Sequence, residues 1–559
     1  MLELLLFITC LLIILITLSI LLGKFISNHF ANNKDRTRFE SYFDTIEKPI
    51  FKLCGVNENE EFTALKYFLV LFYSNIILSI ICFLALYYQN QLPYRGNVTW
   101  QLDVPIILHI LSSLITNTCQ THHIPELHLT HLSNFLILPI LMFYSSASGL
   151  ATGIMAMRSI ILGKIGNPYV DVIKSMTRIL FPLCIITTTI FTFLGIPNTF
   201  TSSINYQTIE GISQKIILGP VAAFEAIKLI GENGQSCFNA NSAHPFENPS
   251  YLSNFIEIIA ILIVPLALII TMGYWLKNHK QSIIIISVLI LVLIFEFTVT
   301  TVPELHGNQM INKLTHSNES NWVGKETRLG IVGSSVFEAA VSNVSGSANA
   351  SLESFYPLAI ALALFNLSNQ AIFGVQGFGL VFTINFILYT TFFIGLMLGR
   401  TPEIFGKRIE RNEIILSSVL LLLNPFLVLF GTVLTLILCP DSSTNIYDHV
   451  HYYTKVFYEF ASGAASNGSG LESLNDNNNY WNLILALVMF LARYGAMSSM
   501  ILLGGSLAHK PSLSATTVRF KTDTILFGFI FLFMSIISTT LIYYPFILLG
   551  PITEIILNN

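Results

Sequence analysis

Long uninterrupted runs of apolar residues recur along this chain, and they constrain its fold more than any other feature. About 20 consecutive apolar residues are enough for a helix to cross a bilayer. Ten such spans are predicted, at residues 2–22, 64–88, 132–156, 173–196, 252–275, 282–302, 371–398, 414–438, 482–507 and 524–549. Only 11% of the residues are charged, against about 25% in soluble domains. The sequence therefore predicts an all-α integral membrane protein.

The polar segments between these spans differ sharply in their content of basic residues. Five of them hold 17 Lys or Arg in 94 residues, and the other four hold 7 in 195 residues. The basic segments are 23–63, 157–172, 276–281, 399–413 and 508–523, and the others are 89–131, 197–251, 303–356 and 439–481. Because basic loops stay on the cytoplasmic side, we expect both termini and the four long segments outside. The first span lacks the basic start and cleavage site of a signal peptide, so we keep it as a helix.

The four exterior segments share one plan, an apolar stretch too short to span followed by a cluster of Asn, Ser, Thr and Gly. The stretches are 106–115, 221–230, 329–341 and 450–460, and the clusters read TNTCQ, GENGQS, SNVSGSAN and SGAASNGSG. From Asn117 to Asn233, Asn343 and Asn467 the steps are 116, 110 and 124 residues. This regularity predicts four pseudo-symmetric repeats of span, re-entrant loop and span around one axis. The alternative is four ordinary exterior turns, since these residues are common turn formers.

The repeats also predict the organisation of the chain. We expect them at 64–156, 173–275, 282–398 and 414–507, with a first span and cytoplasmic loop at 1–63 and a final span at 524–559. In the second repeat, residues 219–249 are too short and too polar to cross the bilayer. A short helix ending at Gly231-Glu232-Asn233-Gly234 would free backbone carbonyls to replace an ion's hydration shell. This arrangement is typical of a pore.

Several specific runs carry a resemblance to a known family. They are GPVAAFEAIKLIGENG from Gly219, FNANSAHPFENP from Phe238, GKETRLGI from Gly324, LGRTPEIFGKRIE from Leu398 and FLARYGA from Phe490. Over nearly its whole length the chain resembles the channel-like A subunit (KdpA) of the bacterial Kdp potassium pump. The resemblance implies the potassium-transporter superfamily fold, with K⁺ as the transported ion. It also implies a complex in the bacterial inner membrane with a P-type ATPase subunit (KdpB-like) and accessory KdpC-like and small KdpF-like subunits.

The resemblance also implies a K⁺-binding filter of four strands. They fall at Thr116-Asn117-Thr118, Asn233-Gly234, Ser345-Gly346 and Asn467-Gly468. Glycine suits three of them, because a residue without a Cβ can aim successive carbonyls at an ion. The surroundings depart from the family pattern. This chain has TNTCQTHHIPE where relatives have TNTNWQSYSGE, and GENGQSCF where they have GTNGGGFF. Its third loop is one residue shorter than theirs. These departures bear on the affinity and selectivity for K⁺.

The seventh predicted span is interrupted by polar residues and by glycines, each of which costs a helix about 1 kcal/mol relative to alanine. By resemblance this segment is an intramembrane loop beneath the filter, which blocks a straight passage and diverts ions towards the ATPase subunit. The implied gate residues are Gln370, Gly374, Gly377 and Gly379, and Gln370 stands where relatives carry glutamate. Arg400, beyond that helix, is either a gating or subunit-contact residue or a cytoplasmic anchor.

Two further charged residues lie near the predicted pore. Arg493 lies in the middle of the span 482–507, where a charge is costly unless it faces a cavity or a partner. It either braces or gates the pore or belongs to a structural ion pair. Glu232, beside the filter, either concentrates cations at the mouth or is a solvated charge on its rim.

Cysteines and histidines in the exterior loops suggest two other features. Cys119 and Cys237 occupy corresponding places in the first two loops, so an exterior disulfide is conceivable. A histidine-rich run, HHIPELHLTH, follows the first loop and lacks the HExxH pattern of a zinc site. Its histidines are His122, His123, His128 and His131. We interpret the run as an exposed or interfacial loop and predict no transition-metal site.

The chain lacks the motifs that would let it use ATP itself. It contains no DKTGT phosphorylation run and no GxxxxGKS or GxxxxGKT phosphate-binding loop. We therefore expect a subunit without catalytic residues or a bound cofactor, which takes K⁺ as its substrate while a partner uses ATP and Mg²⁺. The alternative is a self-sufficient K⁺ channel or cation symporter of the same superfamily. An intramembrane enzyme is disfavoured, because no acid, base and nucleophile converge at one depth.

Overall fold

The structure, a computed structural model, describes residues 1–30, 38–96, 98, 100–118, 120–307, 319–370, 373–440, 445–511 and 521–558. In this part of the chain ten helical segments are long and apolar enough to cross a membrane. Their principal helices are α1 (Leu2–Phe30), α3 (Ala64–Tyr87), α6 (Leu138–Leu162), α8 (Phe181–Phe193), α10 (Tyr251–Leu276), α11 (His279–His306), α15 (Phe378–Met397), α16 (Arg411–Leu438), α18 (Asn479–Ala508) and α19 (Ile525–Ile547). The prediction of ten spans is confirmed.

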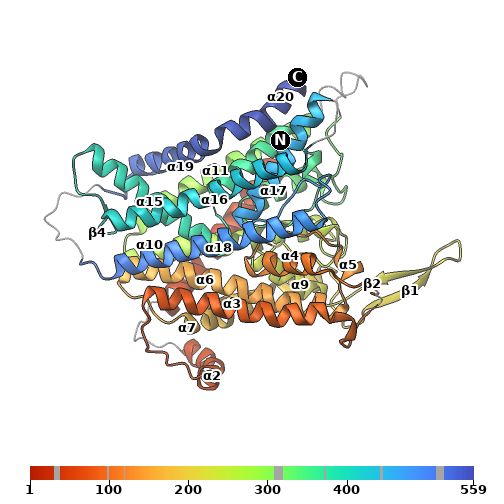
Figure 1. Cartoon of the computed structure of the whole chain (residues 1–559), viewed down its shortest axis with the longest axis horizontal. Helices are drawn as coiled ribbons and strands as arrows, with labels where there is room; N and C mark the ends of the chain where they lie inside the picture. The colour runs from red at the N-terminus through yellow and green to blue at the C-terminus, as the bar shows by residue number, and fades with distance from the viewer. Residues whose placement is uncertain are drawn as a thin grey trace.

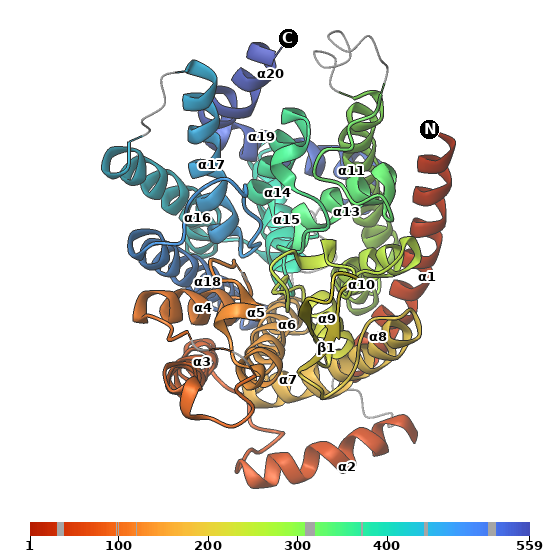
Figure 2. The same cartoon turned by 90° about the vertical axis from the view of Figure 1, so that its right-hand side faces the viewer.

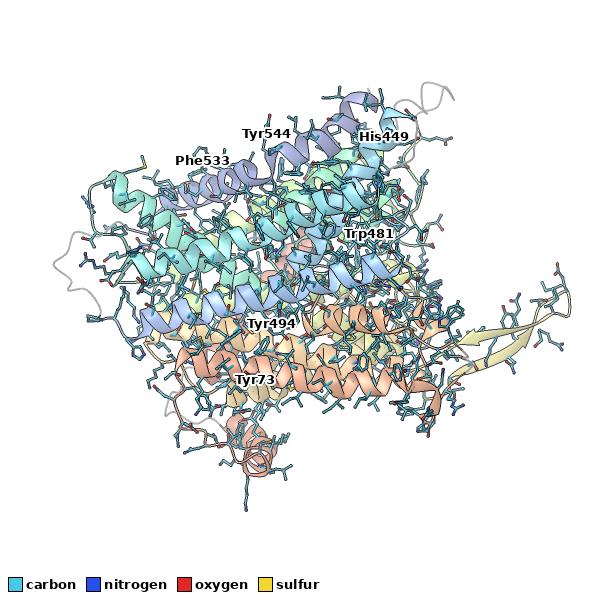
Figure 3. The ribbon with its side chains drawn as sticks, viewed as in Figure 1. Tyr73, His449, Trp481, Tyr494, Phe533 and Tyr544 are labelled. Carbon is cyan, nitrogen blue, oxygen red and sulfur yellow. The ribbon has the colours of Figure 1, made fainter. Side chains whose placement is uncertain are left out.

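Shorter helical pieces extend three of these spans. They are η2 (Ser133–Ile137) before α6, α7 (Pro168–Lys174) and η3 (Ser175–Leu180) before α8, and η6 (Leu548–Ile552) and α20 (Thr553–Asn558) after α19. Figure 1 shows the long helices side by side as one bundle. On its outer helices large aromatic side chains are more than half exposed, among them Tyr73 of α3 and Phe533 and Tyr544 of α19 (Figure 3). Such a surface suits contact with lipid. In α10, by contrast, 89% of its apolar 18-residue stretch is buried in the bundle.

Four re-entrant helices lie between pairs of spanning helices. They are α4 (Val104–Ile115), α9 (Val221–Ile230), α13 (Gly330–Val344) and α17 (Ile446–Ala465). The flanking pairs are α3 and α6, α8 and α10, α11 and α15, and α16 and α18. Figure 2 looks along the bundle and shows α4, α9, α13 and α17 following one another around its centre. The predicted fourfold repeat is confirmed, and α1 and α19 are the two helices outside it.

The seventh span differs from its prediction in where it begins. The sequence predicts helix from residue 371, but the structure has a separate helix α14 (Pro357–Asn369), non-helical residues at 373–377, and then α15 from Phe378. Gln370, Gly374 and Gly377 have φ of 51°, 47° and 77°, which an α-helix cannot contain. The glycines in the sequence indicated this break. Because of the break, the spanning helix begins at Phe378 and not at the predicted residue 371.

The segments outside the bundle carry structure that the sequence analysis did not predict. A hairpin at one end of the bundle pairs β1 (Ser203–Gln207) with β2 (Ser213–Ile217), and a second hairpin at the other end pairs β3 (Glu403–Ile404) with β4 (Lys407–Arg408) (Figure 1). The segment between α1 and α3 contains the helix α2 (Arg38–Leu53). Single turns of helix are α5 (Pro125–His128), η1 (Gln89–Gln91), η4 (Asn241–Ala243) and η5 (Leu352–Ser354).

The GRTPEIFGKRIE run has a structural explanation at this second hairpin. Lys407 is buried, and its Nζ donates to the carbonyl oxygens of Ser159 at 3.2 Å and Leu507 at 2.8 Å. These residues belong to the last turns of α6 and α18. A lysine there gives an additional donor to carbonyls in the last turns of the two helices, and its charge is favoured by the helix dipoles. The run therefore ties together the ends of two helices that belong to different repeats.

Candidate functional site

The four loops that follow the re-entrant helices have unusual backbone conformations. Asn117, Gly234 and Gly468 have φ of 59°, 79° and 97°, in the left-handed region. Such a residue turns the chain sharply after a helix, so that the carbonyls that follow can face a new direction. The third loop differs, because Ser345 is extended, with φ of −148°. This difference agrees with the missing residue in the third loop.

Backbones of three loops approach one another very closely. A Cβ placed on Gly234 would lie 2.7 Å from the nitrogen of Gly346, and a Cβ on Gly346 would lie 2.6 Å from the carbonyl carbon of Gly468. Real side chains do not fit at such distances. Glycine at 234 and 346 is therefore required by the approach of one loop to the next, and the structure brings together three of the four predicted strands.

Asparagine side chains link neighbouring loops. The Nδ2 of Asn117 donates to the carbonyl oxygens of Gly231 at 3.0 Å and Glu232 at 3.3 Å, which joins the first loop to the second. The Nδ2 of Asn467 donates to the carbonyl oxygens of Val341 at 3.0 Å and Ser342 at 3.3 Å, which joins the fourth repeat to the third. The two bonds therefore fix the first repeat to the second and the fourth repeat to the third.

The first two loops are also fixed from within the membrane bundle. Ser145 of α6 donates to Asn117 Oδ1 at 2.9 Å, and the Nδ2 of Asn233 donates to Ser146 Oγ at 3.1 Å. The hydroxyls of Thr116 and Thr118 are 2.7 Å apart. All of these side chains are buried. Buried polar groups that are satisfied in this way rigidify their surroundings.

A buried charge cluster supports the second loop and was missed by the sequence analysis. The Nζ of Lys228, in the last turn of α9, lies 2.8 Å from Glu247 Oε2 and 3.1 Å from Glu225 Oε1. The other oxygen of Glu247 accepts the backbone N–H groups of Cys237 and Phe238, both at 3.0 Å. The HPFENP run therefore supplies the carboxylate that holds the chain just after the second loop. A lone lysine in an apolar helix was the available signal, because a buried charge must be paired.

A cavity of about 430 Å³ lies against the outer side of these loops. Gly346 and Gly468 line it, and so do four acidic residues: Glu338, Glu459, Glu472 and Asp476. None of the described residues that line it is a Lys or Arg. A concave surface of one charge sign focuses the field and raises the local concentration of cations. The cavity therefore attracts cations towards the loops.

The non-helical segment between α14 and α15 lies directly beneath the second loop. The Nε2 of Gln376 donates to the carbonyl oxygen of Ile230, the last residue of α9, at 2.9 Å. A Cβ placed on Gly153 of α6 would lie 2.7 Å from the carbonyl oxygen of Gly377. Phe373, Val375 and Gln376 are buried. Of the predicted gate residues, Gly374, Gly377 and Gly379 lie in or next to this segment, and Gln370 ends α14.

Arg493 and Arg400 lie in very different surroundings. The guanidinium of Arg493 is buried and lies 3.7 Å from the centre of the Phe378 ring, at the start of α15. Among the described residues none of its nitrogens has a hydrogen-bond partner, and no salt bridge to it is found, so the structural ion pair is not what the structure contains. Arg400 is exposed beyond the far end of α15. The structure does not bring it near the segment that it was predicted to gate.

The remaining predictions for the exterior loops fare differently. Glu232 is fully buried, so the prediction of a solvated rim charge is wrong. His122 and His123 are also buried, whereas His128 and His131 are partly exposed, so of the predicted exposed or interfacial loop the exposed alternative is wrong for the first two. The side chain of His122 lies against Glu459, Asp476 and Asn482 of the fourth repeat. Cys237 is buried, and Cys119 lies outside the described residues.

Fold and site together define a multi-pass membrane transporter built from four re-entrant repeats. The family model of the potassium-transporting ATPase A subunit (KdpA) matches residues 9–556, which is nearly the whole chain. The chain therefore belongs to this family, and potassium transport is its function. It is similar to potassium-transporting ATPase potassium-binding subunits from Nostoc sp., with 37% identity over 97% of this chain and 96% of the relative, and from Gloeobacter violaceus, with 33% identity over 98% and 97%.

A solved structure shares the fold at low sequence identity. The potassium transporter TrkH from Vibrio parahaemolyticus superimposes with a TM-score of 0.53 and 14% identity, over 89% of this chain and 98% of that chain. This likeness concerns the fold alone. It agrees with the prediction of the potassium-transporter superfamily architecture.

Proposed function

We propose that this chain is the potassium-binding, channel-like subunit of an ATP-driven potassium import pump. In this proposal K⁺ enters from the exterior through the acidic cavity and binds between the four loops. The filter residues are Thr116, Asn117, Thr118, Asn233, Gly234, Ser345, Gly346, Asn467 and Gly468. The observation that carries the proposal is the close approach of Gly234, Gly346 and Gly468 next to a cavity that is lined, among the described residues, by four carboxylates and by no Lys or Arg.

The chemistry of the loops suits a monovalent cation. Each re-entrant helix ends next to its loop, so the negative ends of four helix dipoles, about half an elementary charge each, are directed to one place. Backbone carbonyls at the loops replace the water that the ion loses. The bonds from Asn117 and Asn467 keep neighbouring loops at a fixed separation, which favours one ion size over another.

The segment at 373–377 suggests the route onward. It lies under the second loop, so an ion in the filter has no straight passage along the axis, and Arg493 adds a fixed positive charge at the same depth. We propose that the ion leaves sideways to a P-type ATPase subunit (KdpB-like) in a complex with KdpC-like and small KdpF-like subunits. That partner would use ATP and Mg²⁺. The complex would lie in the bacterial inner membrane with the filter loops facing the exterior.

Reconstitution tests this proposal against a stand-alone channel or symporter. The chain is placed in vesicles either alone or together with its ATPase partner, and K⁺ accumulation is measured with ATP on the cytoplasmic side. We expect uptake only with the partner, because transport against a gradient needs an energy source that this chain lacks. Accumulation by the isolated chain, driven by a Na⁺ or proton gradient, would establish the symporter. Rapid passive K⁺ flux through the isolated chain would establish the channel.

A further inference from the structure

Three side chains that are remote in sequence meet at the wall of the outer cavity. The Nε2 of His122, just after the first loop, lies 3.5 Å from Glu459 Oε1 of α17 and 3.5 Å from Asp476 Oδ2, beyond the fourth loop. One ligand atom from each of the three residues lies within 4.8 Å of the other two. The side chains of His122 and Glu459 are 1% and 2% exposed, and that of Asp476 is 26% exposed towards the cavity.

The surroundings of His122 orient its free nitrogen towards the two carboxylates. Its Nδ1 lies 2.8 Å from Asn482 Oδ1, an acceptor, so Nδ1 carries the proton, and in the neutral imidazole Nε2 then presents a lone pair. Nε2 has no hydrogen-bond partner in the described part of the chain, and neither has Glu459 Oε2. The ring of His109 stacks on that of His122 at 3.9 Å, and Gln120 donates to Glu459. Such outer contacts are typical of histidines and carboxylates that bind a metal.

The separations fit a shared metal ion better than a shared proton. A charge-assisted hydrogen bond between an imidazolium and a carboxylate is about 2.7–2.9 Å long, and both observed separations are 3.5 Å. Ligands bound tetrahedrally at about 2.0–2.2 Å lie roughly 3.3–3.6 Å from one another. The nitrogen thus lies at a tetrahedral edge length from each of the two oxygens, and no two of the three ligand atoms are more than 4.8 Å apart.

We propose that His122, Glu459 and Asp476 bind a divalent transition-metal ion of the zinc class at the outer mouth of the filter. Imidazole nitrogen and carboxylate oxygen are both zinc ligands, and with three protein ligands water from the cavity completes the fourth position. The imidazole disfavours Mg²⁺ and Ca²⁺, which prefer oxygen ligands only. The charge also favours a dication, because the described residues that line the cavity include four carboxylates and no Lys or Arg.

The bound ion would act on potassium uptake from outside. The same cavity is lined by Gly346 and Gly468, so two positive charges at its wall would repel K⁺ on its way to the loops. External zinc should therefore inhibit the assembled pump. This consequence rests on the proposed function, whereas the binding of the metal does not. The two can fail separately.

Direct binding tests the site. Zn²⁺ is titrated calorimetrically into the purified full-length chain in detergent, and Co²⁺ is used in parallel for its visible absorption. We expect one ion per chain and a tetrahedral Co²⁺ spectrum. His122→Asn and Asp476→Asn should each weaken binding by about 100-fold or more. His131→Asn is the matched control, because this histidine belongs to the same run and instead packs on Phe135. Melting temperatures near the parent value establish that the variants are folded.

Two results would overturn the site: no stoichiometric binding to the parent chain, or equal affinity in the parent, His122→Asn and Asp476→Asn. The inhibition is tested in cells that carry the complete pump, with K⁺ uptake measured at rising external zinc. We expect inhibition in the parent and in His131→Asn, and at least a tenfold higher inhibitory concentration in Asp476→Asn. Equal inhibition in Asp476→Asn would show that zinc acts elsewhere.

Discussion

Gly234 in the second loop packs backbone against backbone on Gly346 in the third loop. A Cβ at position 234 would lie 2.7 Å from the nitrogen and 2.8 Å from the carbonyl carbon of Gly346. Gly234 also has a φ of 79°, a conformation that costs other residues about 1–3 kcal/mol. The separation of these two loops therefore depends on the absence of a side chain.

Replacing Gly234 by alanine should lower ion selectivity before it prevents assembly. The added methyl group must displace the third loop, and a change of 1.4 kcal/mol in relative binding alters discrimination about tenfold. We expect K⁺ discrimination against Na⁺ and Rb⁺, measured as stimulation of ATPase activity in the complex, to fall by about that factor. Gly211→Ala is the matched control, because Gly211 has a φ of 80° but no neighbouring atom within 4 Å of its Cβ position. Unchanged discrimination in Gly234→Ala would refute the assignment of the filter.

Glu247→Gln should destabilise the second loop. This carboxylate pairs with Lys228 and accepts two backbone N–H groups, and hydrogen bonds to a charged group contribute about 1.5–3 kcal/mol. We expect a lower melting temperature in detergent and weaker K⁺ binding. Glu326→Gln, which removes a partly exposed partner of Arg328, is the control and should change the melting temperature little. Equal effects of the two substitutions would contradict the role of Glu247.

Glu232 and Arg493 should be coupled through their charges. Both are fully buried, and neither has a side-chain hydrogen-bond partner among the described residues. We expect Glu232→Gln to raise the K⁺ concentration for half-maximal uptake about tenfold and Arg493→Met to change it in the opposite direction. In the double variant the two effects should not add, because each charge screens the other. Lys66→Met, at an exposed pair with Glu60, should add to Glu232→Gln independently. Additivity with Arg493→Met would exclude the coupling.

Opening the segment beneath the filter should create a leak. Deleting residues 374–377 removes the non-helical turn under α9, so we expect passive K⁺ flux in vesicles to rise while ATP hydrolysis is uncoupled from uptake. Should the folded deletion variant be as tight as the parent, the segment is not the gate.

Arg400→Ala is expected to weaken the coupling of ATP hydrolysis to uptake without altering selectivity, because Arg400 lies beyond the far end of α15. If Arg400→Ala leaves coupling intact, Arg400 is only a cytoplasmic anchor.

The sequence allowed the architecture to be predicted because its main signals are local. Hydrophobic runs and basic loops mark spans one at a time, and α9 has the bounds that its apolar stretch predicted. The pairing of Lys228 with Glu247 and the meeting of His122 with Glu459 could not be predicted in this way. These contacts depend on how loops fold back between repeats. Residues that are more than 300 positions apart, such as His122 and Glu459, share no local pattern.

The central claim is that the four loops hold potassium, and the position of a bound congener tests it most directly. Tl⁺ replaces K⁺ in many sites and scatters X-rays anomalously, so crystals of the complex soaked in Tl⁺ reveal where the ion binds. We predict an anomalous peak enclosed by Thr116–Thr118, Asn233–Gly234, Ser345–Gly346 and Asn467–Gly468, which excess K⁺ removes. A peak elsewhere in the complex, with nothing between these loops, would contradict the account.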